Sequence, residues 1–263
     1  MIRALYSAAS GMTAQQLNVD NIANNLANAN TAGYKMRRAQ FEDLIYQNMI
    51  QPGTAAGAQT TVPAGLQLGL GTRAAGNEII FAQGNMVQTN NPLDLAIQGN
   101  GFFQILQPSG TIAYTRAGQF QLDRNGNIVD ANGNQLEPQI SVPATAQNVT
   151  IAQDGTVSYT LPNQTAAQKA GQIQLASFQN PAGLNSVGNS LYEPTDASGD
   201  PQVGVPGGGD GLGKLMQGYT EQSNVDVVAE FVNLIQSQRA YEANSRVVKA
   251  ADEMYQQINQ VTQ

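Results

Sequence analysis

The stretch SNVDVVAEFVNLIQSQRAYEANSRVVKAADEMYQQINQV, residues 223–261, decides how the rest of the chain is organised. Its apolar side chains recur every seven residues, and further apolar residues stand between them at steps of three and four. The series is Val227, Leu234, Tyr241, Val248 and Tyr255, with Phe231, Ala251 and Ile258 at intermediate positions. This spacing predicts that residues 223–263 form a long α-helix with a narrow apolar seam that pairs with another helix. Ser223 and Asp226 are the candidates for its N-terminal cap.

Residues 1–34 supply the expected partner helix. Alternating steps of three and four connect Leu5, Ala8, Met12, Gln15, Val19, Ile22, Leu26 and Ala29. The opposite face is rich in amides, including Asn18, Asn21 and Asn25, and Gly33 is the expected C-terminal stop. Because one helix precedes the middle of the chain and the other follows it, we expect them to pair antiparallel as a coiled coil. The alternative is that each helix packs separately on the core of its own domain.

Residues 35–76 are expected to form an extended arm or hairpin. Its apolar side chains form two sets, separated by a stretch rich in Ala, Gly and Thr. The sets are Leu44, Ile45, Met49 and Ile50, followed by Leu66, Leu68 and Leu70. The second set alternates with period two, which predicts a strand with one apolar edge. These side chains are too few to build a core, so we expect them to contact neighbouring molecules, with a disordered linker as the alternative.

Residues 77–222 are expected to form an antiparallel β domain, because turn signals recur about every eight to ten residues. The hairpin signals are Asn125-Gly126, Asn132-Gly133 and Asp154-Gly155. Across the last of these, Val149 and Ile151 should face Val157 and Tyr159. Together with the terminal helices, this domain predicts an α+β fold.

The composition excludes several classes of function. The chain has 263 residues and a net charge of −7, and its 12 Lys and Arg residues are scattered, which argues against a nucleic-acid partner. It has no Cys and no His, so thiol chemistry, disulfides and the commonest general base are absent. We see no N-terminal signature of a cleaved signal peptide and no apolar window of about 18 residues, so we expect neither a leader nor a membrane span.

Three motifs have a catalytic or ligand-binding alternative, and each lacks an essential residue. Residues 208–214, GGDGLGK, match the first part of a phosphate-binding loop, but Leu follows where Ser or Thr would hold magnesium. Residues 123–130 alternate oxygen ligands like a calcium loop, but Ile128 stands where such a loop needs Gly. The adjacent acids at 42–43 and 252–253 have no further carboxylate placed opposite them. We therefore expect no enzyme, no cofactor and no metal site.

Four segments resemble the bacterial flagellar axial proteins, the rod and hook family, and they follow the family's order. They are LANANTAGYK at 26–35, QGNMVQTNNPLDLAIQGNGFF at 83–103, YTRAGQFQLDRNGNIVDANGNQL at 114–136 and QGYTEQSNVDVVAEFVNLIQSQRAYEANSR at 217–246. The chain length and the insertion after the first helix resemble the distal-rod type most closely. A proximal rod or hook-type subunit is the alternative within the family, and a secreted β-rich binding module is the alternative outside it.

The resemblance implies a structural subunit that assembles helically into the distal rod of the flagellar basal body. This rod is a hollow drive shaft that transmits torque from motor to hook and leaves an export channel. The implied partners are further copies of the chain, other rod proteins, hook-side proteins, the envelope bushing rings and the flagellar type III export apparatus. The implied location is the rod where it crosses the periplasm and outer envelope, reached by export without a cleaved signal peptide.

The candidate assembly interface combines the two helical seams. It consists of Leu5, Met12, Val19, Ile22, Leu26, Val227, Phe231, Leu234, Tyr241, Val248, Tyr255 and Ile258. The two apolar sets of the arm are the candidate contacts with neighbouring subunits.

Overall fold

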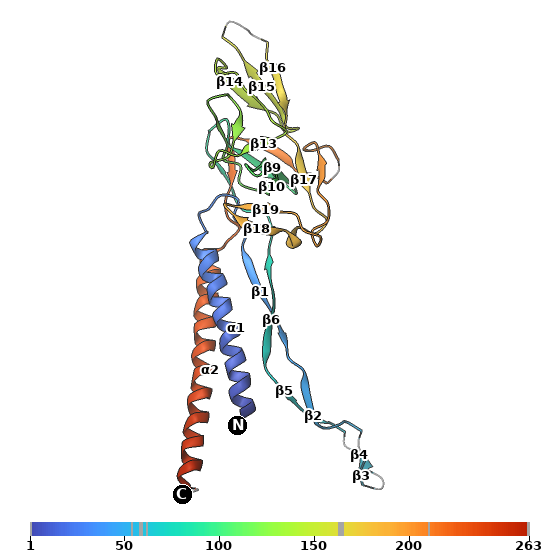
Figure 1. Cartoon of the computed structure of the whole chain (residues 1–263), viewed down its shortest axis with the longest axis vertical. Coiled ribbons are helices and arrows are strands. Elements are labelled where there is room, and N and C mark those ends of the chain that lie inside the picture. The colour runs from blue at the N-terminus through green and yellow to red at the C-terminus, as the bar shows by residue number, and fades with distance from the viewer. Residues whose placement is uncertain are drawn as a thin grey trace. The chain divides into compact units, whose positions relative to one another are not determined.

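The computed structural model describes residues 2–53, 55–57, 60–61, 63–162, 166–209 and 211–261. The chain folds as α+β, with a long helix toward each end and antiparallel strands between them, which confirms the predicted class (Figure 1). Two compact units form, and each combines segments that are distant in sequence. Unit 1 comprises Met1–Ala27, Arg37–Glu78 and Asp226–Gln263, and unit 2 comprises Asn28–Met36 and Ile79–Val225. None of the helices formed by the described residues combines the length and apolarity that a membrane span requires.

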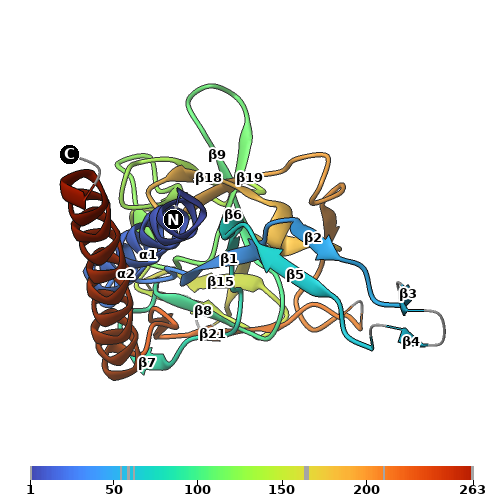
Figure 2. The ribbon, with the colours of Figure 1, turned by 90° about the horizontal axis from the view of Figure 1, so that it is seen from below.

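Unit 1 contains two helices, α1 (Ile2–Ala27) and α2 (Val227–Val261). They lie side by side and run in opposite directions, as two perpendicular views show (Figures 1 and 2). Asp226 caps α2, because its Oδ1 accepts the backbone N–H groups of Val228 at 2.9 Å and Ala229 at 3.2 Å. Ser223, the other candidate cap, instead accepts the N–H of Val225.

The first helix ends at Ala27, several residues before its predicted stop at Gly33. Gly33 has a different role, in unit 2. It adopts a left-handed conformation with φ of 68°, and its N–H donates to the backbone oxygen of Glu221 at 2.8 Å. A Cβ at this position would lie 2.4 Å from the backbone nitrogen of Ala117. Close backbone approach, rather than helix termination, therefore requires the glycine.

Unit 1 also contains three antiparallel strand pairs. They are β1 (Arg37–Asp43) with β6 (Thr72–Ile79), β2 (Tyr46–Ile50) with β5 (Leu66–Gly69), and β3 (Ala55–Gly57) with β4 (Thr60–Thr61). In the second pair Ile50 lies opposite Leu66, and Gln47 lies opposite Leu68. The predicted strand beginning at Leu66 is therefore present. Residues 54, 58, 59 and 62, within the small-residue stretch, lie outside the described part of the chain.

Unit 2 is built on a nine-stranded sheet with the order β11-β12-β13-β9-β10-β19-β18, to which β17 and β20 are joined through β9. Its strands are β9 (Phe102–Leu106), β10 (Ile112–Thr115), β11 (Gln121–Leu122), β12 (Ile128–Val129), β13 (Gln135–Glu137), β17 (Leu175–Ser177), β18 (Asn185–Gly188), β19 (Leu191–Glu193) and β20 (Gln202–Gly204). A short 3₁₀ helix, Pro181–Gly183, follows β17.

Three smaller sheets complete unit 2. One has the order β14 (Asn148–Ile151), β15 (Thr156–Thr160) and β16 (Gln168–Gln172). The others are the pairs β8 (Leu95–Gln98) with β21 (Lys214–Gln217), and β7 (Met86–Gln88) with β22 (Tyr219–Glu221).

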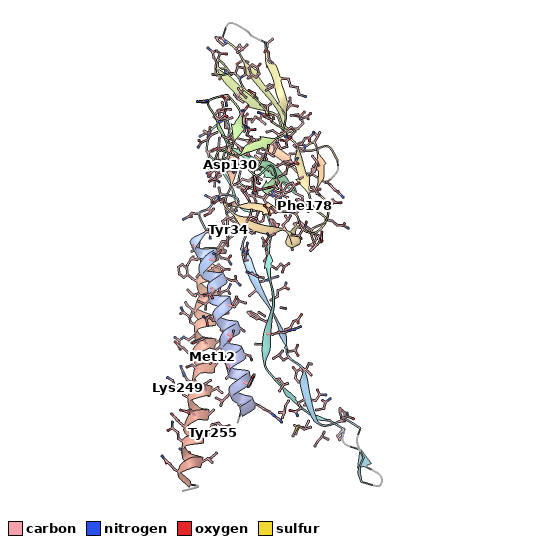
Figure 3. All side chains as sticks on the ribbon, in the orientation of Figure 1. Met12, Tyr34, Asp130, Phe178, Lys249 and Tyr255 are labelled. Atoms are coloured by element: carbon pink, nitrogen blue, oxygen red, sulfur yellow. The ribbon has the colours of Figure 1, made fainter. Side chains whose placement is uncertain are left out.

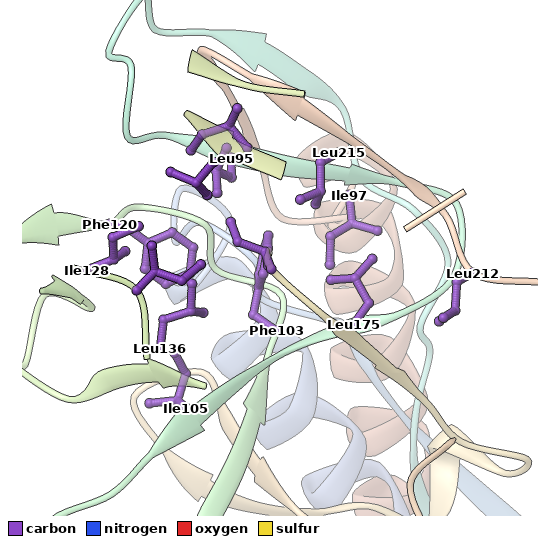
Figure 4. Packing of buried hydrophobic residues seen from close by; sticks show 14 of the residues in the cluster. Leu95, Ile97, Phe103, Ile105, Phe120, Ile128, Leu136, Leu175, Leu212 and Leu215 are labelled. Atoms are coloured by element: carbon purple, nitrogen blue, oxygen red, sulfur yellow. The ribbon is translucent and has the colours of Figure 1, made fainter. Parts of the chain in front are cut away.

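The main core of unit 2 gathers side chains from most of these strands (Figure 4). Phe103 on β9 and Phe120 pack edge to face, with ring centroids 5.1 Å apart. Leu95, Ala96 and Ile97 are all buried, so β8 is covered on both faces. In the sequence, Leu93, Leu95 and Ile97 alternate with polar or small residues, a pattern that predicts a strand but does not predict the burial of its second face.

The predicted hairpins are present, and each closes over three residues, one more than the two-residue loops that Asn-Gly and Asp-Gly favour. In the first, the N–H of Asp123 bonds to the oxygen of Asn127, and Gly126 between them has φ of 83°. The Asp123 carboxylate accepts the N–H groups of Asn125 at 2.7 Å and Asn127 at 2.9 Å. Residues 130–134 repeat this arrangement, with Asp130 accepting the N–H groups of the two asparagines that follow in the turn. The candidate calcium ligands are therefore engaged in turn formation.

The third predicted hairpin joins β14 and β15. Val149 lies opposite Tyr159, and Ile151 lies opposite Val157, as the sequence predicted.

The turn at Asp123 predicts a specific acid sensitivity. Backbone hydrogen bonds, first from Asn127 and then from Asn125, lower the pKa of Asp123 below its ordinary value. Because its pKa is lower in the folded chain than in the unfolded chain, the ionised Asp123 stabilises the fold at pH values above the unfolded pKa of about 3.9. This stabilisation is lost as the pH falls through the folded-state pKa. Asp123→Asn should therefore lower the thermal midpoint at neutral pH, and the difference from wild type should shrink below about pH 4. Asp200→Asn, which makes the same change at an exposed residue, is the control; an equal effect of both variants at all pH values would contradict the prediction.

Candidate assembly interface

Hydrogen bonds between polar side chains join α1 and α2. Asn18 Nδ2 donates to Ser237 Oγ at 2.8 Å, and Asn25 Nδ2 donates to Glu230 Oε2 at 3.4 Å. A Cβ on Gly11 would lie 2.8 Å from Asn244 Nδ2, so the two backbones come close there. The contacting residues recur every seven positions in both helices: Gly11, Asn18 and Asn25 on α1, and Asn244, Ser237 and Glu230 on α2.

Asn18 and Asn25 were expected on the face of α1 away from the partner helix, and this was wrong. The observed contacts repeat every seven positions, but this contacting layer is polar, and a pattern of apolar residues could not reveal it. Leu234, Val248 and Tyr255 follow this layer by one helical turn and are half-buried, and Ala251 is buried. On α1, Ile22 is buried, while the half-buried residues of the predicted seam are Leu5, Met12, Val19 and Leu26. Figure 3 marks Met12 and Tyr255 on their helices.

A further set of contacts joins α1 to the strands of unit 1. Ser10 Oγ accepts the backbone N–H of Thr72 at 3.2 Å, and Asn21 Oδ1 accepts Asn77 Nδ2 at 2.9 Å. The Asn25 amide also bonds to both the N–H and the oxygen of Arg37, at 2.9 Å and 2.8 Å. The amides of α1 therefore hold both α2 and the β1–β6 pair.

The outward side of α2 carries uncovered apolar side chains. Phe231 is 47% exposed and Ile235 is 55% exposed, and with Val228 and Val232 they follow the spacing of one helical stripe. Of the predicted interface, Val227, Phe231, Tyr241 and Ile258 are exposed in the same way. The sequence analysis missed Val228, Val232, Ile235, Val247 and Met254. The steps of four and three residues from Val228 to Val232 and Ile235 could have indicated this stripe in the sequence.

The arm residues are also uncovered. Ile45 is 82% exposed, and Leu44 is half-buried. The remaining members of the two sets are all exposed: Met49, Ile50, Leu66, Leu68 and Leu70. Contiguous exposed apolar surface of this kind is typical of protein–protein contact sites.

Unit 2 contains a buried ion cluster that the sequence analysis did not identify. Glu221, at the end of β22, lies 2.6 Å from Lys35 Nζ through Oε1 and 3.3 Å from an Arg116 guanidinium nitrogen through Oε2. All three side chains are at most 3% exposed. Glu221 Oε1 also accepts the N–H of Gly84 at 2.9 Å. The sequence analysis cited no role for Lys35 or Arg116, although both lie in segments that resemble the family.

The cations of this cluster have further partners in unit 2. Lys35 Nζ donates to the backbone oxygen of Ala82 at 2.8 Å, and Arg116 donates to that of Gly99 at 2.8 Å. Burial lowers the pKa of Lys35, and the neighbouring Glu221 carboxylate opposes that effect. Burial likewise lowers the pKa of Arg116, again opposed by Glu221. Because guanidinium groups stay protonated in proteins, Arg116 remains a cation at the cluster.

The described residues contain no group of three or more acidic, His or Cys side chains that could hold a metal ion. Their conspicuous features are instead the apolar surfaces of unit 1 and the ion cluster of unit 2.

Comparison with known proteins assigns the chain to a class. Residues 5–35 match the family described as "Flagella basal body rod protein", and residues 96–159 match "Flagellar hook protein FlgE/F/G D1 domain". Residues 216–261 match "Flagellar basal body rod FlgEFG protein C-terminal". The chain belongs to the flagellar rod and hook family, as its sequence resemblance indicated.

Within the family, the chain is similar over nearly its whole length to proteins named "Flagellar basal-body rod protein FlgG". It is 48% identical to that of Buchnera aphidicola subsp. Schizaphis graminum, covering 99% of this chain and 100% of the relative. It is 47% identical to that of Caulobacter vibrioides, covering 99% of both chains, and 47% identical to that of Borreliella burgdorferi, covering 97% and 96%. The predicted function, a structural subunit of the distal rod of the flagellar basal body, is confirmed.

The buried ion cluster predicts a large difference between two charge-neutralising variants. Glu221→Gln leaves two buried cations without a carboxylate and should lower the free energy of unfolding by about 3–5 kcal/mol. Glu78→Gln removes the carboxylate that pairs with Arg38 at 3.4 Å on the surface, and should cost about 0–1 kcal/mol. Urea unfolding monitored by circular dichroism gives both values. Equal losses for the two variants would show that the cluster does not stabilise unit 2.

Proposed function

We propose that this rod subunit polymerises through the apolar surfaces of unit 1, forming a straight, hollow shaft that transmits torque and leaves a channel open. The exposed stripe containing Phe231 and Ile235 is the observation that carries the proposal. Burying large apolar side chains away from water is favourable. A neighbouring subunit that packed against this stripe would bury them. The membership of the chain in the rod family supports the same role.

In this proposal α1 and α2 form an antiparallel coiled coil with two functions. The polar layer at Asn18–Ser237 and Asn25–Glu230 sets the register of the pair. Polar residues at such positions fix register at a cost in stability. The apolar residues on the rest of α2, together with the predicted seam, contact neighbouring helices in the polymer. The helical segments 1–34 and 223–263 would thus act as assembly elements, and the β-rich domain 77–222 would be a separate part of the subunit.

We further propose that residues 35–76 form an extended arm that braces adjacent subunits. The exposed residues of β2 and β5 support this role, because neither strand buries its apolar side chains within the chain. A neighbouring subunit would cover Ile45, Met49 and the leucines of β5. Contacts made by an arm of this kind resist sliding between subunits and would make the shaft stiff.

The proposed partners are copies of the chain, other rod proteins below, hook-side proteins above, the envelope bushing rings and the type III export apparatus. The proposed location is the part of the basal-body rod that crosses the periplasm and outer envelope. The role is mechanical and includes no catalytic step. Family membership supports the basal-body location.

Polymerisation should depend on the exposed stripe of α2. Phe231→Asp should prevent formation of tubes, because each subunit contact would then bury an unpaired charge at a cost of several kcal/mol. Phe231 is 47% exposed in the single chain, so the helix content and thermal unfolding of the monomer should remain near those of the wild type. Electron microscopy and sedimentation of the concentrated protein measure the assembly. Phe231→Leu is the matched control and should still polymerise; tubes formed by the aspartate variant would contradict the proposed interface.

The arm should determine the stiffness of the polymer. Ile45→Asp places a charge on a residue that is 82% exposed in the single chain, so the monomer should fold normally. If neighbouring subunits cover this side chain, the polymers should be more bent or irregular than wild type, whereas Ile45→Val should leave them straight. Persistence length measured on electron micrographs distinguishes these outcomes. Unchanged straightness in the aspartate variant would show that the arm is only a connection.

A further inference from the structure

Asparagine followed by glycine occurs three times in the chain, at 100–101, 125–126 and 132–133, each time in unit 2. Such a pair can lose ammonia without an enzyme. The glycine backbone nitrogen attacks the side-chain carbonyl carbon of the asparagine, a new C–N bond closes a cyclic imide, and the side-chain amide leaves as ammonia. The N–H proton of the glycine passes through solvent to the leaving nitrogen. Water then opens the imide to aspartate or isoaspartate, so the sequence of steps needs no oxidant or reductant.

Two of these pairs lie in turns that match in sequence and in local hydrogen bonding. The turns are DRNGN at 123–127 and DANGN at 130–134, which differ only in their second residue. In each turn the glycine N–H donates to the backbone oxygen of the first aspartate, at 3.0 Å for Gly126 and 3.1 Å for Gly133. A difference in reactivity between the two turns must therefore come from contacts with the rest of unit 2.

The first turn is held in place by a neighbouring segment. Gly126 is buried, and its backbone oxygen accepts the N–H of Val142 at 2.7 Å. A Cβ on Gly126 would collide with the backbone oxygen of Val142, so the two backbones are in close contact. The Asn125 amide also donates to the Asp123 carboxylate at 3.4 Å. Imide formation requires the backbone to rotate so that the glycine nitrogen reaches the side chain, and this rotation would break the bond to Val142.

The pair at 100–101 is also enclosed. Gly101 is buried, and a Cβ there would lie 3.3 Å from Leu175 and 3.4 Å from Leu212. The backbone oxygen of Asn100 accepts the N–H of Gly213 at 2.7 Å. Neither solvent access nor backbone rotation is therefore available to this pair in the folded chain.

The second turn, 130–134, is open. Asn132 and Gly133 are both exposed, and a Cβ on Gly133 would meet nothing within 4 Å. Figure 3 labels Asp130, the first residue of this turn. Exposed turns of this kind open locally at little cost in free energy, so the glycine nitrogen can approach the side chain of Asn132.

We propose that Asn132 is a site of spontaneous modification, which converts to aspartate and isoaspartate through the cyclic imide, and that the folded chain protects Asn125 and Asn100. Isoaspartate carries the backbone through the former side chain and so lengthens the turn between β12 and β13. Both products add a negative charge near Asp130. The site lies within unit 2 and does not depend on the proposed polymerisation.

Peptide mass spectrometry of the aged protein tests this assignment. The dilute full-length chain is incubated at mildly alkaline pH and digested at intervals, and the three asparagine-containing peptides are quantified. Asn132 should convert at least about fivefold faster than Asn125, because opening the first turn must break one additional hydrogen bond. In urea, where the contacts with Val142 and Leu175 are lost, the three rates should become similar. Equal rates in the folded chain, or faster conversion at Asn125 or Asn100, would overturn the proposal.

An exchange of the one differing residue separates tertiary protection from local sequence. The double variant Arg124→Ala, Ala131→Arg gives each turn the sequence of the other, and both positions are exposed, so the thermal midpoint should stay unchanged. Position 132 should still convert faster than position 125 in this variant. A reversed order would show that local sequence sets the rates and would overturn the proposed protection. Asn132→Gln, which retains an amide but disfavours imide closure, should remove the conversion at this turn and leave the other two rates as they are.

Discussion

The buried carboxylate of Glu221 is the interaction on which the organisation of unit 2 depends. It bonds to Lys35, to Arg116 and to the N–H of Gly84, and the backbone oxygen of Glu221 accepts the N–H of Gly33. These residues come from four separate stretches of sequence. The chain enters unit 2 after α1 and leaves it before α2, so Glu221 ties the entering segment to the leaving one. Removing one partner of a buried ion pair leaves an uncompensated charge, which strongly destabilises the fold. The two segments are therefore held together by an interaction that is costly to break.

Unit 1 uses polar contacts where an apolar seam was expected. The contact layer of α1 contains Gly11, Asn18 and Asn25, which bury little apolar surface, so the α1–α2 layer contributes little hydrophobic stabilisation. The same asparagine at position 25 serves α2 and the β1 strand at once. Amides are suited to this double role because each carries both a donor and an acceptor. Hydrogen bonds therefore join the two helices at this layer, while several large apolar side chains of α2, such as Phe231 and Ile235, remain exposed.

This division of roles is consistent with a subunit whose stability and assembly rest on different surfaces. Unit 2 has a dense apolar core around Phe103 and a buried ion cluster, both contained within the unit. Unit 1 leaves Phe231, Ile235 and Ile45 exposed. In the proposed polymer, unit 2 would supply the folded core, and the exposed side chains of unit 1 would become buried where copies meet.

The sequence by itself determined the α+β class, the two terminal helices, the positions of the hairpins, the register of the hairpin at Asp154-Gly155, and the family. These features depend on the periodicity of apolar residues, on turn residues such as Asn125-Gly126, and on sequence motifs of the family. All of these signals lie in residues that are close together in the sequence. Only the tertiary structure decided which face of α1 meets α2, that Gly33 allows close backbone approach, and that Glu221 joins Lys35 and Arg116. Hydrophobic patterning could not identify a polar layer, because an asparagine has the same character whether it bonds to water or to another helix. Nor could it pair charges 105 and 186 residues apart, because that proximity is created by the folding of unit 2.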